Sequence, residues 1–301
     1  MATMPVARRS RGRLMSRTTA VGWSFLLPNF IGFAIFTLIP VGLLFYYSFT
    51  EWNVFTGAEW NGLANFSRLL HDPSFWTALR NTFYYSAFHI PLTLGAALAL
   101  ALLLNRKMRG VAFFRTAAFF PYITSIVAIA QVWNMLYSPG FGPINEIIRG
   151  FGVDNPPGWT SSANWSMPAV IIVGVWREMG YFMLLILAGL QTIPAQLYEA
   201  ARVDGANAWQ QLRAVTLPGL RPTMFFVTVV LTIYSFKVFD LILVMTDGGP
   251  GQSTLVLAQY IYQKGFEEQE FGYASAVSIV LFAICIAVTV FQFLVNKRRE
   301  A

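Results

Sequence analysis

The sequence predicts an all-α membrane protein with six transmembrane helices, and three observations support this. Of its 301 residues, 56% are hydrophobic and only 12% are charged, which is too apolar for the surface of a soluble domain of this size. The apolar residues form long blocks separated by short polar loops, instead of being interleaved with charges. The basic residues gather in alternate loops, as in membrane proteins oriented by the positive-inside rule.

Six apolar blocks are each long enough to cross a bilayer, because a helix needs about 20 apolar residues to span the hydrocarbon core. The first block follows a basic segment, as in a signal peptide. Its apolar run is too long for one, however, and no small-residue cleavage site follows, so we expect an uncleaved anchor. The expected spans are Val21 to Phe49, Thr82 to Leu104, Ala117 to Tyr137, Met167 to Leu190, Thr223 to Met245 and Tyr273 to Val295.

The basic residues predict the orientation of these spans. With the N-terminus in the cytoplasm, 15 of the 21 Lys and Arg residues fall inside, so we expect a multi-pass inner-membrane protein with both termini cytoplasmic. Residues 1–17 form a basic tail and residues 18–301 the six-helix transmembrane domain. The same distribution explains the net charge of +7 as membrane topology, so we expect no nucleic-acid partner.

Residues that could form a disulfide, bind a metal or bind a nucleotide are scarce in this chain. The single cysteine, Cys285, and the two histidines, His71 and His89, cannot build a disulfide framework or a Cys/His metal site. The chain lacks the Gly-x-x-x-x-Gly-Lys-Ser/Thr phosphate loop, and it shows no constellation for hydrolysis. We therefore expect no catalytic residue, no metal and no cofactor in this chain, and any ATP must be bound by a separate subunit.

The cytoplasmic loop between the fourth and fifth expected spans, residues 191–222, predicts a helix, a turn and a second helix. The stretch 195–203 favours a helix, and Gly205 supplies a left-handed C-cap position. A second helix can begin at Asn207, with Gln210 three residues later as in a capping box. A short helix held across a tight turn is suited to dock on another protein and move with it.

This loop resembles the integral membrane subunits of binding-protein-dependent ABC importers. Their signature is Glu-Ala-Ala, three residues, Gly, nine residues, an aliphatic residue, one residue and Leu-Pro, and this chain departs from it only in having Val215 where isoleucine is usual. The resemblance implies a coupling helix that seats in a cleft of a cytoplasmic ATPase, with Glu199 accepting a charge-assisted hydrogen bond. The implied coupling residues are Glu199, Ala200, Ala201, Asp204, Gly205, Leu217 and Pro218.

The resemblance covers nearly the whole chain and is closest to carbohydrate-importer permeases of the maltose and glycerol-phosphate type. The segments that carry it are FTEWN (49–53), LLNRKMRG (103–110), FFRTAAFFPY (113–122), YEAARVDGA (198–206), MTDGGPGQST (245–254) and FGYASA (271–276). Gly-Gly-Pro after the fifth span and the tryptophan of FTEWN resemble the first of the two unlike permeases in such systems. The implied partners are a second, unlike permease, a dimeric ATPase that binds ATP–Mg, an extracytoplasmic solute-binding protein, membrane lipid and a sugar substrate.

Local matching to the family also implies a substrate pathway along the third, fourth and fifth spans. Because charge inside a membrane is costly, charged residues there should face a cavity or one another. Lys237 and Asp240 are three positions apart on an expected helix, which favours an ion pair, and a purely structural role in helix pairing stays open. Of these two residues, Lys237 is a better candidate for substrate selectivity than Asp240. The candidates are Tyr122, Gly174, Arg177, Glu178, Ser235, Lys237, Val238 and Asp240.

Two other functions compete with that of an importer subunit. An ion-coupled secondary transporter could use the charged residues within the spans as a relay, but such proteins usually have more spans and internal repeats and have no use for a coupling loop. A membrane-embedded enzyme has less support, because no catalytic constellation is present.

Overall fold

The computed structural model describes residues 11–53, 55, 57–106 and 109–300, so the predicted basic tail is described only from Arg11 onward. Over this part the chain is helical apart from one antiparallel hairpin. The elements before residue 105 are α1 (Arg11–Phe33), the π-helical η1 (Ala34–Leu38), α2 (Ile39–Ser48), β1 (Thr50–Asn53), β2 (Gly57–Trp60), α3 (Ala64–Leu70) and α4 (Pro73–Leu104). The elements after it are α5 (Val111–Ile123), α6 (Ile126–Leu136), α7 (Pro143–Gly150), α8 (Ser166–Gln191), α9 (Ala195–Val203), α10 (Ala208–Gln211), η2 (Leu212–Thr216), α11 (Leu217–Gly219), α12 (Arg221–Phe236), α13 (Asp240–Met245), α14 (Leu257–Tyr262), η3 (Gln263–Glu267) and α15 (Phe271–Glu300).

Six crossings are found only when two bent pairs are counted. Four helical segments of the described chain are long and apolar enough to span a membrane alone, namely Val21–Ser48, Pro73–Leu104, Ser166–Gln191 and Phe271–Arg298. The other two are α5 with α6, bent by 97°, and the segment Ala208–Gly219 with α12, bent by 66°. The predicted membrane fold is thus confirmed, with two of its spans broken.

Two breaks fall inside spans that were expected to be continuous, whereas the 66° bend lies at Leu220, before the expected start of the fifth span at Thr223. In the third expected span, Thr124 and Ser125 take extended backbone angles, with ψ of 149° and 126°, between α5 and α6. In the fifth, α12 ends at Phe236 and α13 begins at Asp240. Hydrophobicity alone does not predict the first break, because Ile123 and Ile126 on either side of it are apolar, whereas the second break lies between the charged residues Lys237 and Asp240. Within a membrane, non-helical backbone is tolerated where it lines a cavity.

Glycines let the central helices approach closely. A Cβ added to Gly180 of α8 would lie 1.8 Å from the Ala118 carbonyl oxygen of α5, and one added to Gly189 would lie 2.4 Å from Thr223 Oγ1 of α12. Small residues at helix crossings allow backbones to pack against each other in a membrane. Helices α4, α5, α8 and α12 therefore form a tight bundle around the buried side chains Phe182, Met183 and Ile186.

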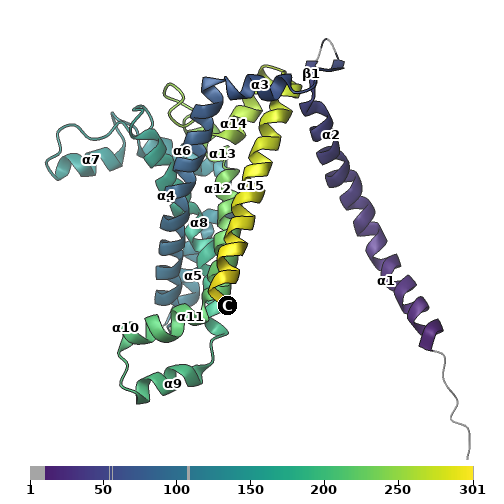
Figure 1. The fold of residues 1–301 in the computed structure, drawn as a ribbon. Coiled ribbons are helices and arrows are strands. Elements are labelled where there is room, and N and C mark those ends of the chain that lie inside the picture. The colour runs from purple at the N-terminus through teal and green to yellow at the C-terminus, as the bar shows by residue number, and fades with distance from the viewer. Residues whose placement is uncertain (1–10, 54, 56, 107–108, 301) are drawn as a thin grey trace, which may run out of the picture.

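The first span stands apart from this bundle. In Figure 1, α1 and α2 form one long rod that leans away from the bundle; it connects along the chain through β1, β2 and α3, and α2 also contacts α15 directly. The apolar window of this rod has none of its residues buried, and Phe25 and Phe36 are more than 80% exposed. The hairpin itself is fixed to α15, since a Cβ on Gly272 would lie 2.0 Å from the Thr50 carbonyl oxygen. The rod thus has a firm attachment but presents its apolar sides outward.

A polar cluster, the hairpin-side latch, joins α3 and the start of α4 to α14 and α15. Asp72 caps α4 by accepting from Ser74 N at 2.9 Å. Its other carboxylate oxygen accepts from the hydroxyl groups of Tyr260 and Tyr273. Although partial burial raises the pKa of Asp72, these hydrogen bonds outweigh it and hold the pKa below its ordinary value.

An ion pair and a ring contact complete the latch. Arg68 pairs with Glu270 at 2.8 Å, and its guanidinium lies 4.2 Å from the centre of the Tyr273 ring. Figure 1 places the latch and the hairpin at one end of the molecule, whereas α9, α10, the end of α15 and the start of α1 lie at the other.

Candidate translocation pathway and coupling loop

A cavity of about 280 Å³, here called the central cavity, lies where α4, α5, α6, α8, α12 and α13 meet. The bend between α12 and α13 contributes directly to its wall, and the bend between α5 and α6 flanks it through Tyr122 and Ile126. It is lined by Tyr85, Tyr122, Ile126, Gly174, Arg177, Glu178, Tyr234, Lys237, Val238, Phe239, Asp240 and Leu241.

Seven of the eight residues proposed for the substrate pathway line this cavity. The eighth, Ser235, is buried with 1% exposure and instead forms a hydrogen bond of 2.8 Å with His89 Nδ1. Gly174 lines the cavity and also leaves room for two side chains behind it, since an added Cβ would lie 2.6 Å from Tyr85 Oη and 3.1 Å from His89 Nε2. The structure therefore brings the candidate set together, with Ser235 behind the cavity wall.

The charges on the cavity wall are unevenly paired. Arg177 Nη1 lies 3.7 Å from Glu178 Oε1, and the Arg177 guanidinium lies 5.4 Å from the centre of the Tyr122 ring, which stacks on Tyr181 at 4.3 Å. The expected ion pair between Lys237 and Asp240 is wrong, because no such pair occurs in the part of the chain that the structure describes. The helix ends before Lys237, so the i, i+3 geometry of a single helix does not apply.

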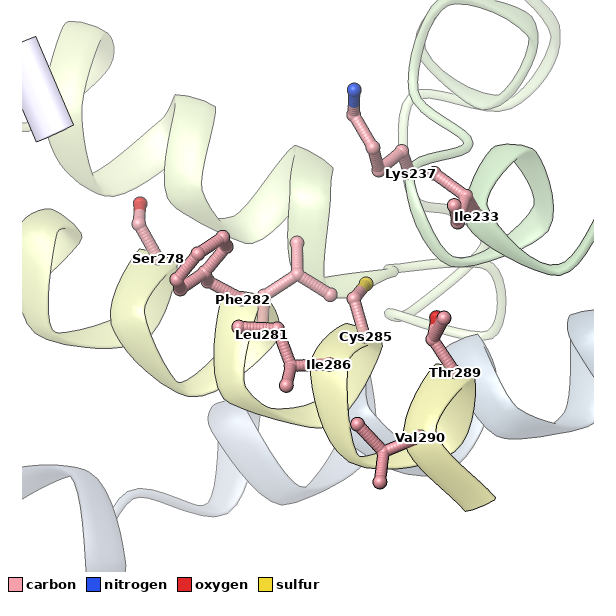
Figure 2. Close-up of a pocket in the computed structure, with 9 residues that line it drawn as sticks. All are labelled: Ile233, Lys237, Ser278, Leu281, Phe282, Cys285, Ile286, Thr289 and Val290. Carbon is pink, nitrogen blue, oxygen red and sulfur yellow. The ribbon is translucent and has the colours of Figure 1, made fainter. Parts of the chain in front are cut away.

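Lys237 also borders a second hollow, the groove of about 530 Å³ between α12 and α15. Figure 2 shows Ser278, Leu281, Phe282, Cys285, Ile286, Thr289 and Val290 of α15 along this groove, with Ile233 and Lys237 on the facing segment. Of the described residues that line it, Lys237 is the only charged one. Because a lone ammonium in an apolar groove is poorly solvated, the central cavity is the more favourable place for its charge.

Three residues at or behind the cavity wall were not among the candidates predicted from the sequence. Tyr85 and Tyr234 add phenol groups to the cavity wall, and His89 lies directly behind it. A histidine within an apolar span was a usable signal, since ionisable residues inside membranes are rare. Tyr85 and Tyr234 had no such signal, because aromatic residues are common in membrane helices. Among the described residues, no group of three or more His, Cys, Asp or Glu residues is placed to hold a metal.

The coupling loop has the predicted shape. Helix α9 spans Ala195–Val203, and Gly205 follows with φ of +79°. The Ala206 amide then donates to the Ala201 carbonyl at 2.8 Å, which is the 6→1 bond of a Schellman motif. Asn207 and Gln210 form both halves of the predicted capping box before α10.

The structure divides the signature between two places. Glu199 and Ala200 are exposed on α9, where no residue is buried, and Asp204 is the C-cap residue. Leu217 and Pro218 lie in α11, where the loop rejoins the bundle. One part of the signature is therefore exposed on α9, and the other part lies where the loop leads into α12.

Apolar side chains on the loop are also exposed. Val203 is 88% exposed and Trp209 is 68% exposed, although polar residues usually occupy such positions in a loop. The two arms remain joined by a 3.1 Å hydrogen bond between the hydroxyl groups of Tyr198 and Thr216. Exposed apolar groups on a hydrogen-bonded frame are typical of a docking surface.

Comparison with known proteins agrees with this geometry. The profile of the family described as binding-protein-dependent transport system inner membrane component matches residues 75–301. The diacetylchitobiose uptake system permease NgcF of Streptomyces coelicolor is 33% identical over 97% of this chain and 88% of its own length. The lactose transport system permease LacF of Rhizobium radiobacter is 33% identical over 98% of this chain and 100% of its own length. A bacterial ABC transporter involved in the import of the acidic polysaccharide alginate has a chain that superposes with a TM-score of 0.83, at 26% identity over 95% of this chain and 99% of that one.

Proposed function

We propose that this chain, which belongs to the family of binding-protein-dependent transport system inner membrane components, carries a sugar or sugar-like solute into the cytoplasm as one of two unlike permease subunits. The energy comes from ATP–Mg bound by a separate, dimeric ATPase. An extracytoplasmic solute-binding protein delivers the solute at the hairpin end. The chain itself is a transport subunit of the membrane and supplies the path.

The coupling loop is the single observation that carries this proposal. Its shape is fixed by its own hydrogen bonds, and it presents Glu199 at the end of the molecule opposite the hairpin. An ion-coupled transporter has no need of such a loop. In the proposed orientation this end and both termini face the cytoplasm, which places the exposed helix α9 within reach of an ATPase.

The central cavity supports the sugar as the class of substrate. Three phenol groups, two cationic and two anionic side chains line it, so its wall offers both hydrogen-bond donors and acceptors to hydroxyl groups. The relatives include a lactose permease and a diacetylchitobiose permease, and the structural relative is involved in the import of alginate. Phenol rings also provide flat apolar faces for the C–H faces of sugar rings.

The test is to tag the chain in its native host, solubilise the membrane gently and identify the co-purifying proteins by mass spectrometry. We expect an ATPase and a second, unlike permease in comparable amounts. A tagged Glu199→Lys variant, expressed at the same level, serves as the control and should recover less ATPase but the same amount of permease. Recovery of the chain alone, as a monomer or homodimer, would contradict the proposal and favour the ion-coupled transporter.

A further inference from the structure

His89 lies at the middle of α4, where side chains from three helices surround it. It is only 1% exposed, and its ring stacks on Tyr85 at 4.8 Å with an interplanar angle of 17°. Its Nδ1 atom lies 2.8 Å from Ser235 Oγ of α12. Its Nε2 atom lies 3.6 Å from Glu178 Oε2 of α8. The ring therefore stands between the end of α12 and a carboxylate on the cavity wall.

Two buried atoms at this contact have no hydrogen-bond partner of normal geometry in the part of the chain that the structure describes, although the Gly174 backbone also interacts with the His89 ring. They are His89 Nε2 and Glu178 Oε2, and they face each other. Leaving a buried polar atom without a partner costs free energy, so buried polar groups are nearly always paired. At 3.6 Å the two atoms are less than 1 Å from hydrogen-bond distance. A small shift of either side chain completes the bond.

The serine sets which ring nitrogen carries the proton. If the Ser235 hydroxyl donates to Nδ1, the neutral ring carries its proton on Nε2, the atom that faces Glu178. Arg177 approaches the other carboxylate oxygen, Glu178 Oε1, at 3.7 Å. The carboxylate therefore lies between Arg177 at the cavity wall and His89 behind it.

We propose that His89 is a positioning residue that holds the Glu178 carboxylate toward the central cavity as a hydrogen-bond acceptor for substrate hydroxyl groups. This inference rests on the proposed function, since it assigns a role within that transport path. Because Ser235 lies two residues before the bend at Lys237, His89 also links the position of this bend to the carboxylate. A change of the bend during the transport cycle then reaches Glu178 through the ring.

The test uses the complete importer in proteoliposomes, with this chain, its second permease, its ATPase and its binding protein. Uptake of lactose, diacetylchitobiose and an alginate trisaccharide is measured for the wild type to find the best substrate. The variants are His89→Leu, His89→Gln, Glu178→Gln and the double variant His89→Leu with Glu178→Gln. Thr93→Val is the matched control, because Thr93 is another fully buried residue of α4 whose hydroxyl group has no partner in the described chain, and it does not line the cavity.

We expect His89→Leu to lower the maximal uptake rate about tenfold, which corresponds to the usual coupling energy between contacting residues. The KM should change little, because the binding protein captures the solute first. His89→Gln, which can still accept from Ser235 and donate toward Glu178, should keep at least about half of the rate. The double variant should be no slower than Glu178→Gln alone. Thr93→Val should transport as the wild type does.

Each contrary outcome is distinct. If the wild type transports a sugar but His89→Leu is as fast, or if its effect adds fully to that of Glu178→Gln, the role of His89 is overturned and the proposed function stands. If His89→Gln is as slow as His89→Leu at equal assembly, a packing role replaces positioning. If the assembled wild type moves none of the three sugars, the proposed substrate class is wrong. The role assigned to His89 is then wrong as well, because it depends on that substrate class.

Discussion

In the coupling loop, most of the hydrogen bonds that fix the shape join residues three to five positions apart, as between Asn207 and Gln210 or between Ala206 and Ala201. At the central cavity, the corresponding bond joins His89 to Ser235, 146 positions away. The loop therefore holds its form largely by itself, whereas the cavity exists only when the whole bundle is packed. This contrast predicts that loop variants change coupling without loss of assembly, and that cavity variants change what is transported.

The largest effect is expected for the charge reversal Glu199→Lys in the coupling loop. Reversing a charge at a docked interface costs about 3 kcal/mol, so ATP-driven uptake should fall roughly 100-fold, while the chain still inserts into the membrane with its second permease. Gln196→Lys, on an exposed position of the same helix, is the control and should transport nearly normally. ATP hydrolysis and uptake are measured in the same proteoliposomes. Wild-type uptake by Glu199→Lys would remove the loop from coupling.

A smaller effect is expected for Gly205→Val. The left-handed φ of +79° costs a β-branched residue about 1–3 kcal/mol, so the two arms of the loop should lose their relative orientation and uptake per ATP should fall about tenfold. Gly205→Asn is the control, because asparagine tolerates the left-handed region, and should retain most of the activity. Equal ratios of uptake to ATP hydrolysis in both variants would show that the turn conformation does not matter.

On the cavity side, Lys237→Gln should change the substrate range more than the rate. Removing a cation from the wall should lower uptake of an alginate trisaccharide relative to lactose by about fivefold, or about 1 kcal/mol, since the acidic sugar loses a charge partner. Lys264→Gln is the control, because Lys264 pairs with Glu268 at 2.5 Å and does not line the cavity. An unchanged ratio of the two uptake rates would exclude Lys237 from selectivity.

The smallest effect concerns the hairpin-side latch, which depends on distant contacts as the cavity does but lines no pathway. Asp72→Asn should weaken the hydrogen bonds from Tyr260 and Tyr273, at a cost of about 1–2 kcal/mol, and lower the Tm of the purified chain by roughly 4 °C. Uptake should change little. Ser74→Ala, beside the same helix start, is the control.

The pH dependence of the latch has a definite sign. Because the folded-state pKa of Asp72 is lowered, its contribution to stability is complete above the ordinary carboxyl pKa of about 3.9 and is lost as the pH falls through the lowered value. The difference in Tm between wild type and Asp72→Asn should therefore shrink below about pH 4. A difference that is constant from pH 7 to pH 3 would contradict the assigned charge.

What could be predicted from the sequence follows the same contrast. Periodicity and caps are local signals, so the bounds of α9, the turn at Gly205 and the capping box at Asn207 were predicted correctly. The number of spans was confirmed when both bent pairs are counted. The length of an apolar stretch is also a local signal, because it depends only on consecutive residues.

The breaks at Thr124 and at Lys237 could not be predicted in this way. They depend on which backbone groups reach the cavity, and this is decided by helices far apart in the chain. The place of Ser235 behind the cavity wall could not be predicted for the same reason, since its partner His89 belongs to another span. The clearance that Gly174 gives to Tyr85 also appears only in the packed bundle.

The crossing of α5 and α8 at Gly180 limits how such a protein can move. The Ala118 carbonyl oxygen occupies the place of a side chain there, 1.8 Å from where a Cβ would be, and the residues next to Gly180 along α8 carry side chains. Sliding one helix past the other by a residue would drive a side chain into that oxygen. The crossing therefore restricts sliding of α5 along α8, and it leaves rotation about Gly180 as the less hindered movement of the two helices.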